Sequence, residues 1–332
     1  MKALVVTRIG GPEELPDMLE IREIPEPVAN EGEVLVRVEA VGVNFADVLG
    51  VKGKYPGGPQ PPYVPGREFS GVVEATGEAV MGYAQHSACA ERIAVSRKMV
   101  WSRPQNWDAT LGAAFPVNYF TAWLALWKGG VVPEIAPADP SPIGDAKPYR
   151  ALIHAAAGGV GTAGVQLGRL MEIETFGTAS QDTKLERLKE FGLDHGINYK
   201  REDYEQRVME LTNGEGVDVV FDSLAGEHTA KSLRCCRFLG RVIMYGNTSG
   251  ERPKFDTMAM YSKAASLHGL WLSKLSLNET LMQQALRSMT PWIDSGRLKP
   301  IVGATLPFEQ TADAYRMLLE RTNFGKVALT LG

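Results

Sequence analysis

The chain has 332 residues, enough for two domains of ordinary size with a core in each. Its formal net charge is −4 and it carries no basic block, so nucleic acid is not an expected partner. No stretch reaches the roughly 18 uncharged apolar residues that a membrane-spanning helix needs. Three cysteines can build neither a disulfide framework nor a four-thiolate zinc site, and they fit a reducing compartment, so we expect a cytoplasmic protein.

The first 100 residues predict a β-rich domain. Short runs of Val, Ile and Leu are separated by Gly, Pro and Glu clusters, a spacing typical of a compact antiparallel barrel. The expected strands are 2–7, 19–24, 33–41, 69–75 and 91–95. Between the third and fourth strands, residues 42–71 form a long irregular stretch rich in proline and glycine. Long loops in compact domains are often functional, so we look for site residues here.

Residues 150–180 predict a strand, a glycine turn, a helix and a second strand. The short apolar run 151–155 is typical of a strand buried on both faces of a parallel sheet. The literal match to the dinucleotide fingerprint G-x-G-x-x-G uses Gly159, Gly161 and Gly164. We favour an overlapping register, Ala156, Gly158 and Gly161, because its turn comes directly at the end of the strand. There, backbone N–H groups at a helix N-terminus can approach a pyrophosphate.

The strand after this helix, around residues 173–176, indicates which dinucleotide is bound. It ends in the sequence GTAS rather than in the Asp or Glu that would bind the ribose 2′-hydroxyl of NAD. Ser180, Lys184 and Arg187 lie just beyond and offer a hydroxyl and two cations to a 2′-phosphate. The sequence therefore predicts NADPH as the cofactor. The alternative is that Lys184 and Arg187 are only the solvated face of a helix over 182–191.

The remaining elements alternate in the manner of a parallel α/β domain. Helices are expected at 115–127, 182–191, 201–212, 278–295 and 308–320. Strands are expected at 217–221, 241–245, 266–272 and 326–331. The prolines within residues 131–149 suggest a surface excursion before the first Rossmann-type strand.

Sequence blocks along nearly the whole chain resemble one family. They include GVNFAD (Gly42–Asp47), PGREFSG (Pro65–Gly71), PVNYFTA (Pro116–Ala122), AAAGGVG, FGTAS, INYKREDY, GVDVVFDSLAG, GRVIMYGNTSG and FGKV. As a set they are similar to the zinc-independent quinone oxidoreductases, the zeta-crystallin-like branch of the medium-chain dehydrogenase/reductase superfamily. HAAAGGVG, FGTAS and the C-terminal end look closest to vesicle-amine-transport-protein-like members.

The resemblance implies a fold of class α/β, in which a doubly wound Rossmann domain is inserted into a GroES-like β-barrel catalytic domain. We place the Rossmann NADP-binding domain at 121–261 and the catalytic domain at 1–120 and 262–332. A homodimer is expected from the family, through the edges of the Rossmann sheets.

The family's cofactor pattern carries over to positions that match it in this chain. The resemblance places Gly158, Gly159, Val160 and Gly161 at the pyrophosphate, Ser180, Lys184 and Tyr199 at the 2′-phosphate and adenosine, Asn118, Thr121 and Asn247 at the nicotinamide half, and Lys326 near the phosphates. For Tyr199 the alternative is simple packing of an aromatic ring after a short strand.

The irregular loop carries the candidate catalytic residues. Zinc alcohol dehydrogenases of the superfamily bind their metal with a Cys and with the His of a G-H-E motif. Asn44 and Arg67 stand at those positions here, and since arginine cannot ligate zinc, we expect no metal site. Tyr55 is the candidate proton donor to a developing oxyanion, and Asn44 the candidate to orient the substrate or the nicotinamide carboxamide. The alternative for both is local hydrogen bonding, and Asp47 with Arg67 is a second choice, as an ion pair that shapes the loop.

Without a Lewis acid, the expected substrates are those that accept hydride readily. The first hypothesis is a zinc-independent NADPH-dependent oxidoreductase that reduces quinones or α,β-unsaturated carbonyls, an NADPH:quinone reductase or enone reductase. The alternative is a non-catalytic NADPH-binding sensor or a membrane-trafficking-type protein of the same fold. Two departures from the family pattern bear on this choice: Leu49 stands where many members carry a second tyrosine, and residues 80–85 lack the usual G-D-R-V turn.

Overall fold

The computed structural model describes residues 1–132 and 148–331, which form two compact units. The first consists of Met1–Val117 and Met289–Gly332, and the second of Asn118–Ser288. The sequence places the second boundary earlier, at 262. The difference arises because the segment after 262 supplies a strand, β13 (Ser266–Gly269), to the sheet of the second unit. Of the predicted surface excursion at 131–149, residues 133–147 lie outside the described residues.

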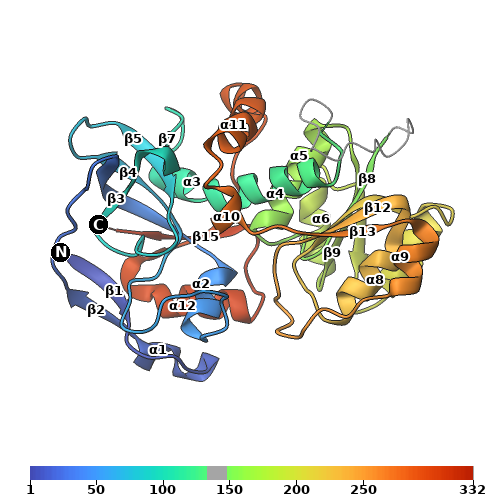
Figure 1. Cartoon of the computed structure of the whole chain (residues 1–332), viewed down its shortest axis with the longest axis horizontal. Helices are drawn as coiled ribbons and strands as arrows, with labels where there is room; N and C mark the ends of the chain where they lie inside the picture. Colours follow the sequence, from blue (N-terminus) through green and yellow to red (C-terminus); the bar gives the residue numbers. More distant parts are fainter. Residues whose placement is uncertain (133–147, 332) are drawn as a thin grey trace. The chain divides into compact units, whose positions relative to one another are not determined.

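A seven-stranded sheet forms the framework of the first unit. Its strand order is β14-β15-β3-β4-β5-β7, with β6 paired to β3. The strands are β3 (Glu33–Val43), β4 (Glu68–Val73), β5 (Ala79–Tyr83), β6 (Arg92–Ser96), β7 (Val100–Ser102), β14 (Val302–Pro307) and β15 (Lys326–Thr330). Because β15 pairs antiparallel with β3, the C-terminal strand lies in the same sheet as the N-terminal strands (Figure 1). A separate antiparallel pair joins β1 (Lys2–Val6) to β2 (Leu19–Glu23).

The sequence pattern does not predict the strand β5, and in this region it shows only that residues 80–85 lack the family's G-D-R-V turn. In the structure β5 pairs antiparallel with β4 along its whole length. Its local signal is weak because Gly82 interrupts the run. That glycine is needed, since a Cβ there would lie 2.3 Å from the ring of Phe69 on β4.

Short helices complete the first unit. They are η1 (Pro12–Glu14), α1 (Leu15–Met18), α2 (Phe45–Val51), η2 (Arg97–Met99), α3 (Ala109–Ala113), η3 (Phe308–Gln310) and α12 (Thr311–Leu319). The longer helices α4 (Pro116–Lys128) and α11 (Glu279–Asp294) each include the residues at which the units divide. The α12 helix contacts both α2 and β15. Helix α2 lies within residues 42–71, which the sequence predicts to be irregular, so that expectation is wrong for Phe45–Val51.

The second unit is a doubly wound Rossmann sheet. Its six parallel strands have the order β10-β9-β8-β11-β12-β13, which is 3-2-1-4-5-6 in chain order. The strands other than β13 are β8 (Arg150–Ile153), β9 (Glu174–Ala179), β10 (His195–Asn198), β11 (Val217–Asp222) and β12 (Cys236–Met244). The winding reverses between β8 and β11, and ligands of such sheets bind at this switch point. The predicted α/β class with a Rossmann sheet is therefore confirmed.

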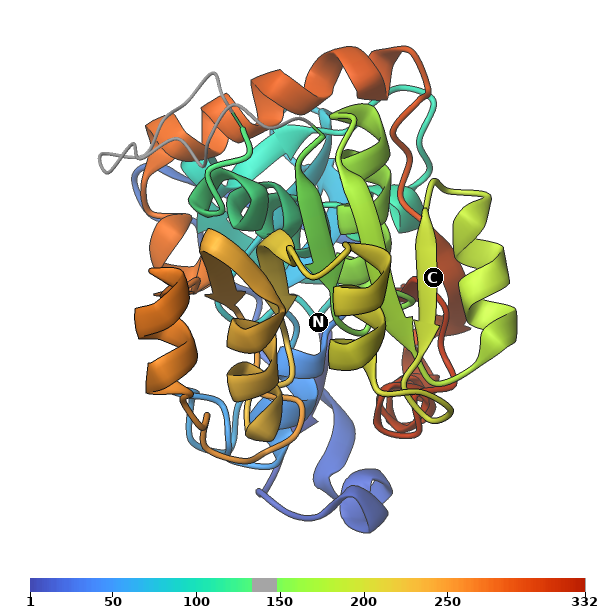
Figure 2. The ribbon, with the colours of Figure 1, turned by 90° about the vertical axis from the view of Figure 1, so that its right-hand side faces the viewer.

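Helices α5 (Gly159–Leu170), α6 (Asp182–Lys189), α8 (Glu227–Cys235) and α9 (Thr257–Lys263) contact strands of this sheet and flank it in Figure 2. Helix α7 (Tyr204–Leu211) contacts α8, and a short α10 (Leu272–Leu275) follows β13. The central strand β11 is buried throughout, as is typical of a parallel sheet covered on both faces. Cys235 ends α8 and Cys236 begins β12. All three cysteines are free and buried.

Candidate functional site

Asn44 is the N-cap of α2, at the point where β3 leaves the sheet. Its backbone N–H donates to Asp47 Oδ2 at 2.9 Å. Its side-chain Nδ2 donates to Gly42 O at 3.1 Å and to Glu68 Oε1 at 2.9 Å. Its Oδ1 accepts from Lys326 Nζ at 2.7 Å. Both amide hydrogens are therefore engaged, and what Asn44 can still offer a ligand is one lone pair on Oδ1.

Lys326 and Glu68 form an ion pair inside the first unit. Lys326 Nζ pairs with Glu68 Oε1, and the two side chains are 3% and 0% exposed. The other carboxylate oxygen, Oε2, accepts from the backbone N–H of Val117 at 2.8 Å, at the start of α4. Helix N-termini favour negative charge, so this contact also supports the carboxylate. The ammonium that we expected near cofactor phosphates is thus held by Glu68 and Asn44, and its contact with phosphates stays a prediction.

Tyr55 follows α2 in the irregular loop, and its ring is covered on one face by Arg67. The guanidinium carbon of Arg67 lies 3.8 Å from the centroid of the Tyr55 ring. Arg67 Nε is 3.6 Å from Asp47 Oδ1, and both partners are almost fully buried. Burial raises the pKa of the Asp47 carboxyl to about 6, although the Arg67 charge acts in the opposite direction. The expected Asp47–Arg67 pair is therefore present and extends to the candidate proton donor.

Glu68 is the residue of this cluster that sequence reasoning missed. A signal was available, because Glu68 directly precedes the strand predicted at 69–75 and Lys326 begins the strand predicted at 326–331. A charge at the start of a buried strand needs a partner. Nothing in the sequence indicated that these two would meet.

The glycine turn lies at the C-terminal end of β8. Gly158 is the N-cap of α5, and Ala155 takes a left-handed φ of 49° in the turn. A Cβ on Gly161 would lie 2.4 Å from Ala155 O, so the helix can approach the turn only with glycine at this position. This close packing fits the register that ends on Gly161. A Cβ on Gly159 would lie 2.5 Å from Oδ1 of Asn118, which brings a residue predicted for the nicotinamide half beside the turn.

The residues predicted for the 2′-phosphate lie at the ends of neighbouring strands. Ala179 pairs with Asn198, and the N–H of Tyr199 donates to Ala179 O at 3.2 Å, so Tyr199 lies beside the start of the segment that begins with Ser180. Lys184 is in the first turns of α6, and partial burial lowers the pKa of its ammonium. A carboxylate is also close in sequence, but Asp182 accepts from Asn198 Nδ2 at 2.6 Å and pairs with Arg201.

A surface pocket of about 380 Å³ borders Tyr199. Its lining is aromatic and cationic with two acids, and it consists of Tyr199, Lys200, Arg201, Glu202, Asp203, Tyr204, His228 and Lys231. The pocket opens beside the ends of the strands that carry the 2′-phosphate candidates.

The other nicotinamide-half candidates occupy two further segments. Thr121 lies on α4, one turn after Asn118, and both are buried. Asn247 follows β12, and its Oδ1 accepts from the N–H of Gly250 at 3.0 Å and from Ser249 Oγ at 3.2 Å. Val160, expected at the pyrophosphate, lies in the first turn of α5. The roles of all these residues toward a cofactor stay predictions.

Metal-ligating side chains are dispersed in the described part of the chain. Within residues 1–132 and 148–331, no three His, Cys, Asp or Glu side chains come together as a group that could hold a metal ion. In the same ranges, no helix is long and apolar enough to cross a bilayer.

Comparison with known proteins gives consistent relatives along the whole chain. Residues 159–291 match the family model "Zinc-binding dehydrogenase", and residues 30–97 match "Alcohol dehydrogenase GroES-like domain". The chain is 33% identical over 358 residues to the synaptic vesicle membrane protein VAT-1 homolog of Rattus norvegicus, covering 100% of this chain and 84% of that protein.

Two solved structures show the same fold over the full length. The quinone oxidoreductase from Thermus thermophilus, also solved in complex with NADPH, has a TM-score of 0.83, 33% identity and 100% coverage of both chains. The Escherichia coli quinone oxidoreductase complexed with NADPH has a TM-score of 0.87, 25% identity and 100% coverage of both chains. The chain belongs to the medium-chain dehydrogenase/reductase superfamily, close to the VAT-1 and quinone oxidoreductase-like proteins.

Proposed function

We propose that this protein is a zinc-independent, NADPH-dependent reductase of quinones or α,β-unsaturated carbonyls. The observation that carries the proposal is the glycine turn at the switch point of the Rossmann sheet. Ser180 and Tyr199 follow the ends of two adjacent strands there, and the nearby carboxylate of Asp182 is already hydrogen-bonded to Asn198. The relatives solved with NADPH support the same cofactor. The zinc-independent chemistry is supported by Arg67, whose guanidinium packs on Tyr55 where the superfamily's zinc enzymes place a histidine.

The residues of the second unit fit a dinucleotide. The Gly158–Gly161 turn leaves no space for side chains toward Asn118 and Ala155, so its backbone N–H groups would hold the pyrophosphate. Ser180, Lys184 and Tyr199 would hold the 2′-phosphate and adenosine, and Asn118, Thr121 and Asn247 the nicotinamide half. When bound, the cofactor would supply the hydride.

The chain's own part of the reaction is orientation and proton supply. In our proposal Tyr55 donates its hydroxyl proton to the substrate oxygen that becomes negative. Asn44, with both amide hydrogens engaged, contributes through its remaining Oδ1 lone pair, which accepts a hydrogen bond from a substrate or carboxamide donor.

The test is the loss of NADPH absorbance with purified protein. Phenanthrenequinone, benzoquinone and a short enone series serve as acceptors, and NADH runs in parallel. Turnover with NADPH and little with NADH supports the proposal. Binding of NADPH without turnover of any acceptor would instead favour the alternative, an NADPH-binding sensor or trafficking-type protein, which the similarity to VAT-1 homologs supports.

The cofactor preference gives a prediction of its own. We expect the Ser180→Ala/Lys184→Met variant to bind NADPH about 10- to 100-fold more weakly, because charge-assisted hydrogen bonds to the 2′-phosphate are lost. NADH lacks that phosphate, so its affinity should hardly change. Fluorescence titration measures both. Lys189→Met, on the same helix but paired with Glu186, is the matched control. An equal loss for both cofactors would place these residues elsewhere than at the 2′-phosphate.

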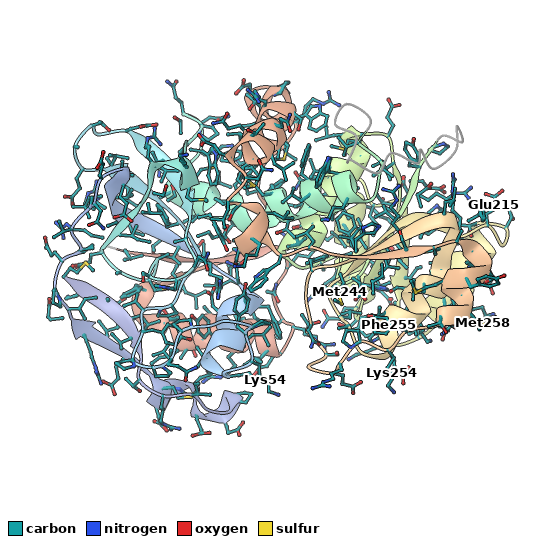
Figure 3. The ribbon with its side chains drawn as sticks, in the orientation of Figure 1. Lys54, Glu215, Met244, Lys254, Phe255 and Met258 are labelled. Atoms are coloured by element: carbon teal, nitrogen blue, oxygen red, sulfur yellow. The ribbon has the colours of Figure 1, made fainter. Side chains whose placement is uncertain are left out.

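We also propose a homodimer formed through the Rossmann sheet edge at β13. In the described residues β13 pairs only with β12, so its other edge is open to a second chain. On α9, which contacts β12, and just before it, Phe255, Met258 and Tyr261 are 55%, 69% and 82% exposed, a concentration of large apolar side chains typical of an interface. Figure 3 shows Phe255 and Met258 on α9 and the segment before it.

We expect Met258→Asp/Tyr261→Asp to convert this dimer to a monomer, because the two charges would be buried without partners. Sedimentation equilibrium measures the change. Val28→Asp, at an exposed apolar position of the first unit, is the control and should stay dimeric. A monomeric wild type would overturn the assembly proposed here.

A further inference from the structure

Arg67 lies in the segment that enters β4, and it is buried with 6% of its surface exposed. Its guanidinium stacks on the Tyr55 ring at 3.8 Å. A desolvated cation over an aromatic face is one of the stronger contacts available to a phenol ring. The Tyr55 backbone is tied as well, since its N–H donates to Leu49 O at 3.1 Å and its carbonyl accepts from Gly58 N at 3.1 Å. Tyr55 is thus held by the Arg67 guanidinium on its ring and by the hydrogen bonds of its own backbone.

One carboxylate connects this stack to the other candidate catalytic residue. Asp47 Oδ1 faces Arg67 Nε, and Asp47 Oδ2 accepts from the N–H of Asn44. Asp47 is 4% exposed and sits in the first turn of α2, which Asn44 caps. A buried guanidinium without a counter-charge would be costly, so Asp47 keeps Arg67 in place. The positions of Asn44 and Tyr55 are therefore linked through two residues that need not touch a substrate.

We propose that Arg67 is a positioning residue for the reduction: anchored by Asp47, its guanidinium holds the Tyr55 ring so that the phenol hydroxyl meets the substrate oxygen. This rests on the proposed function. When hydride adds to the β-carbon of an enone, the C=C electron pair moves to the carbonyl oxygen. The Tyr55 O–H bond then breaks, its proton passes to that oxygen to give the enol, and water returns a proton to the phenolate.

The Asp47–Arg67 contact depends on pH, whereas the contact between Arg67 and the Tyr55 ring by itself does not. Other charged or titratable groups near Asp47 are Lys326, Glu68, Tyr63, Cys89 and Tyr315. With an Asp47 pKa of about 6, the carboxylate that attracts Arg67 is present above that pH and is lost as the pH falls through it. The rate should therefore decline on the acid side, and replacing Arg67 should remove that decline.

The contact is tested first without turnover. In protein labelled with 3-fluorotyrosine, the Tyr55 resonance is assigned with Tyr55→Phe. We expect Arg67→Met to shift or broaden this resonance, because the ring loses its cationic neighbour. Arg22→Met, an exposed arginine paired with Glu20, is the control and should leave it unchanged. An unchanged Tyr55 resonance in Arg67→Met overturns the inference whether or not the protein is active.

The kinetic test is a double-mutant cycle. We expect Arg67→Met to lower kcat for an enone by about ten-fold with the NADPH affinity unchanged, and to abolish the acid limb of the pH profile. In the Tyr55→Phe background the same change should have no further effect, since Arg67 acts through the ring. Effects that multiply, or an acid limb that persists, would show a structural role and overturn the inference.

Two outcomes separate this inference from the proposed function. If wild type turns over no quinone or enone, the proposed function is wrong, and the positioning role that rests on it is wrong as well. If wild type is active and Arg67→Met is equally active, only the inference fails. Should Arg67→Met not fold because Asp47 is left unpaired, the Asp47→Asn/Arg67→Met variant removes both charges and enters the same cycle.

Discussion

Replacing Lys326 by Met is expected to lower the free energy of unfolding by about 3–5 kcal/mol, because it strands a buried carboxylate. Glu68 is fully buried, and its Oε1 loses the ammonium while Asn44 Oδ1 loses its donor. The contacts that remain to the carboxylate are Asn44 Nδ2 and the N–H of Val117. Urea unfolding followed by circular dichroism measures the loss.

The double variant Glu68→Gln/Lys326→Met should recover a large part of this stability, since no unpaired charge is then buried. Lys54→Met, at an exposed lysine, should change stability by less than about 0.5 kcal/mol. If instead Lys326 mainly held cofactor phosphates, Lys326→Met would weaken NADPH binding and leave the apo protein as stable as wild type. The experiment therefore decides between the two roles of this residue.

The second large effect concerns His154, which directly follows β8 in the Rossmann sheet. It is fully buried, with its ring nitrogens 3.2 Å from Thr178 Oγ1 and 3.1 Å from Ser232 Oγ, and its ring lies edge-on to Tyr204. Burial lowers the pKa of His154 from 6.5 to about 4, although the charge of Asp222 acts in the opposite direction. The ring is therefore neutral in the folded protein over a range in which it is protonated in the unfolded chain.

The sign of the pH effect follows from proton binding. Between the two pKa values the unfolded chain binds a proton that the folded protein does not, so folding stability falls as the pH decreases. We expect His154 to account for about 2–3 kcal/mol of lost unfolding free energy between about pH 7 and about pH 4.5. His154→Gln should show a correspondingly shallower dependence in urea unfolding series.

Ser232→Ala is the matched control for His154. It removes one hydrogen bond of the imidazole but keeps the titrating group, so it should lower stability at every pH and retain the wild-type dependence on pH. Identical pH dependence in His154→Gln and wild type would mean that another group produces the acid sensitivity.

The features predicted from the sequence are those with a local cause. The parallel α/β alternation, the glycine turn before α5 and the strand end without a carboxylate all depend on residues within a few positions of one another. The change from a β-rich pattern to an α/β pattern along the chain likewise indicated a β-rich domain and a parallel α/β domain. The boundary proposed at 262 precedes the strand expected at 266–272, whereas the chain divides after Ser288, because that strand pairs with β12 as β13. The strand β5 was missed because Gly82 weakens its local pattern. The need for glycine there comes from the Phe69 ring on β4, which leaves no room for a Cβ.

The sequence by itself determined the fold class and the glycine turn before α5, and it indicated the segment that carries Asn44 and Tyr55. The tertiary structure alone decided what surrounds these two residues. Lys326 contacts Asn44 although the two are 282 positions apart in the chain, and Arg67, just before β4, stacks on the Tyr55 ring. Backbone periodicity and turn chemistry are local, whereas a buried charge takes as its partner whichever opposite charge the packed sheet brings within reach. For that reason the sequence could identify the charged residues but not their partners.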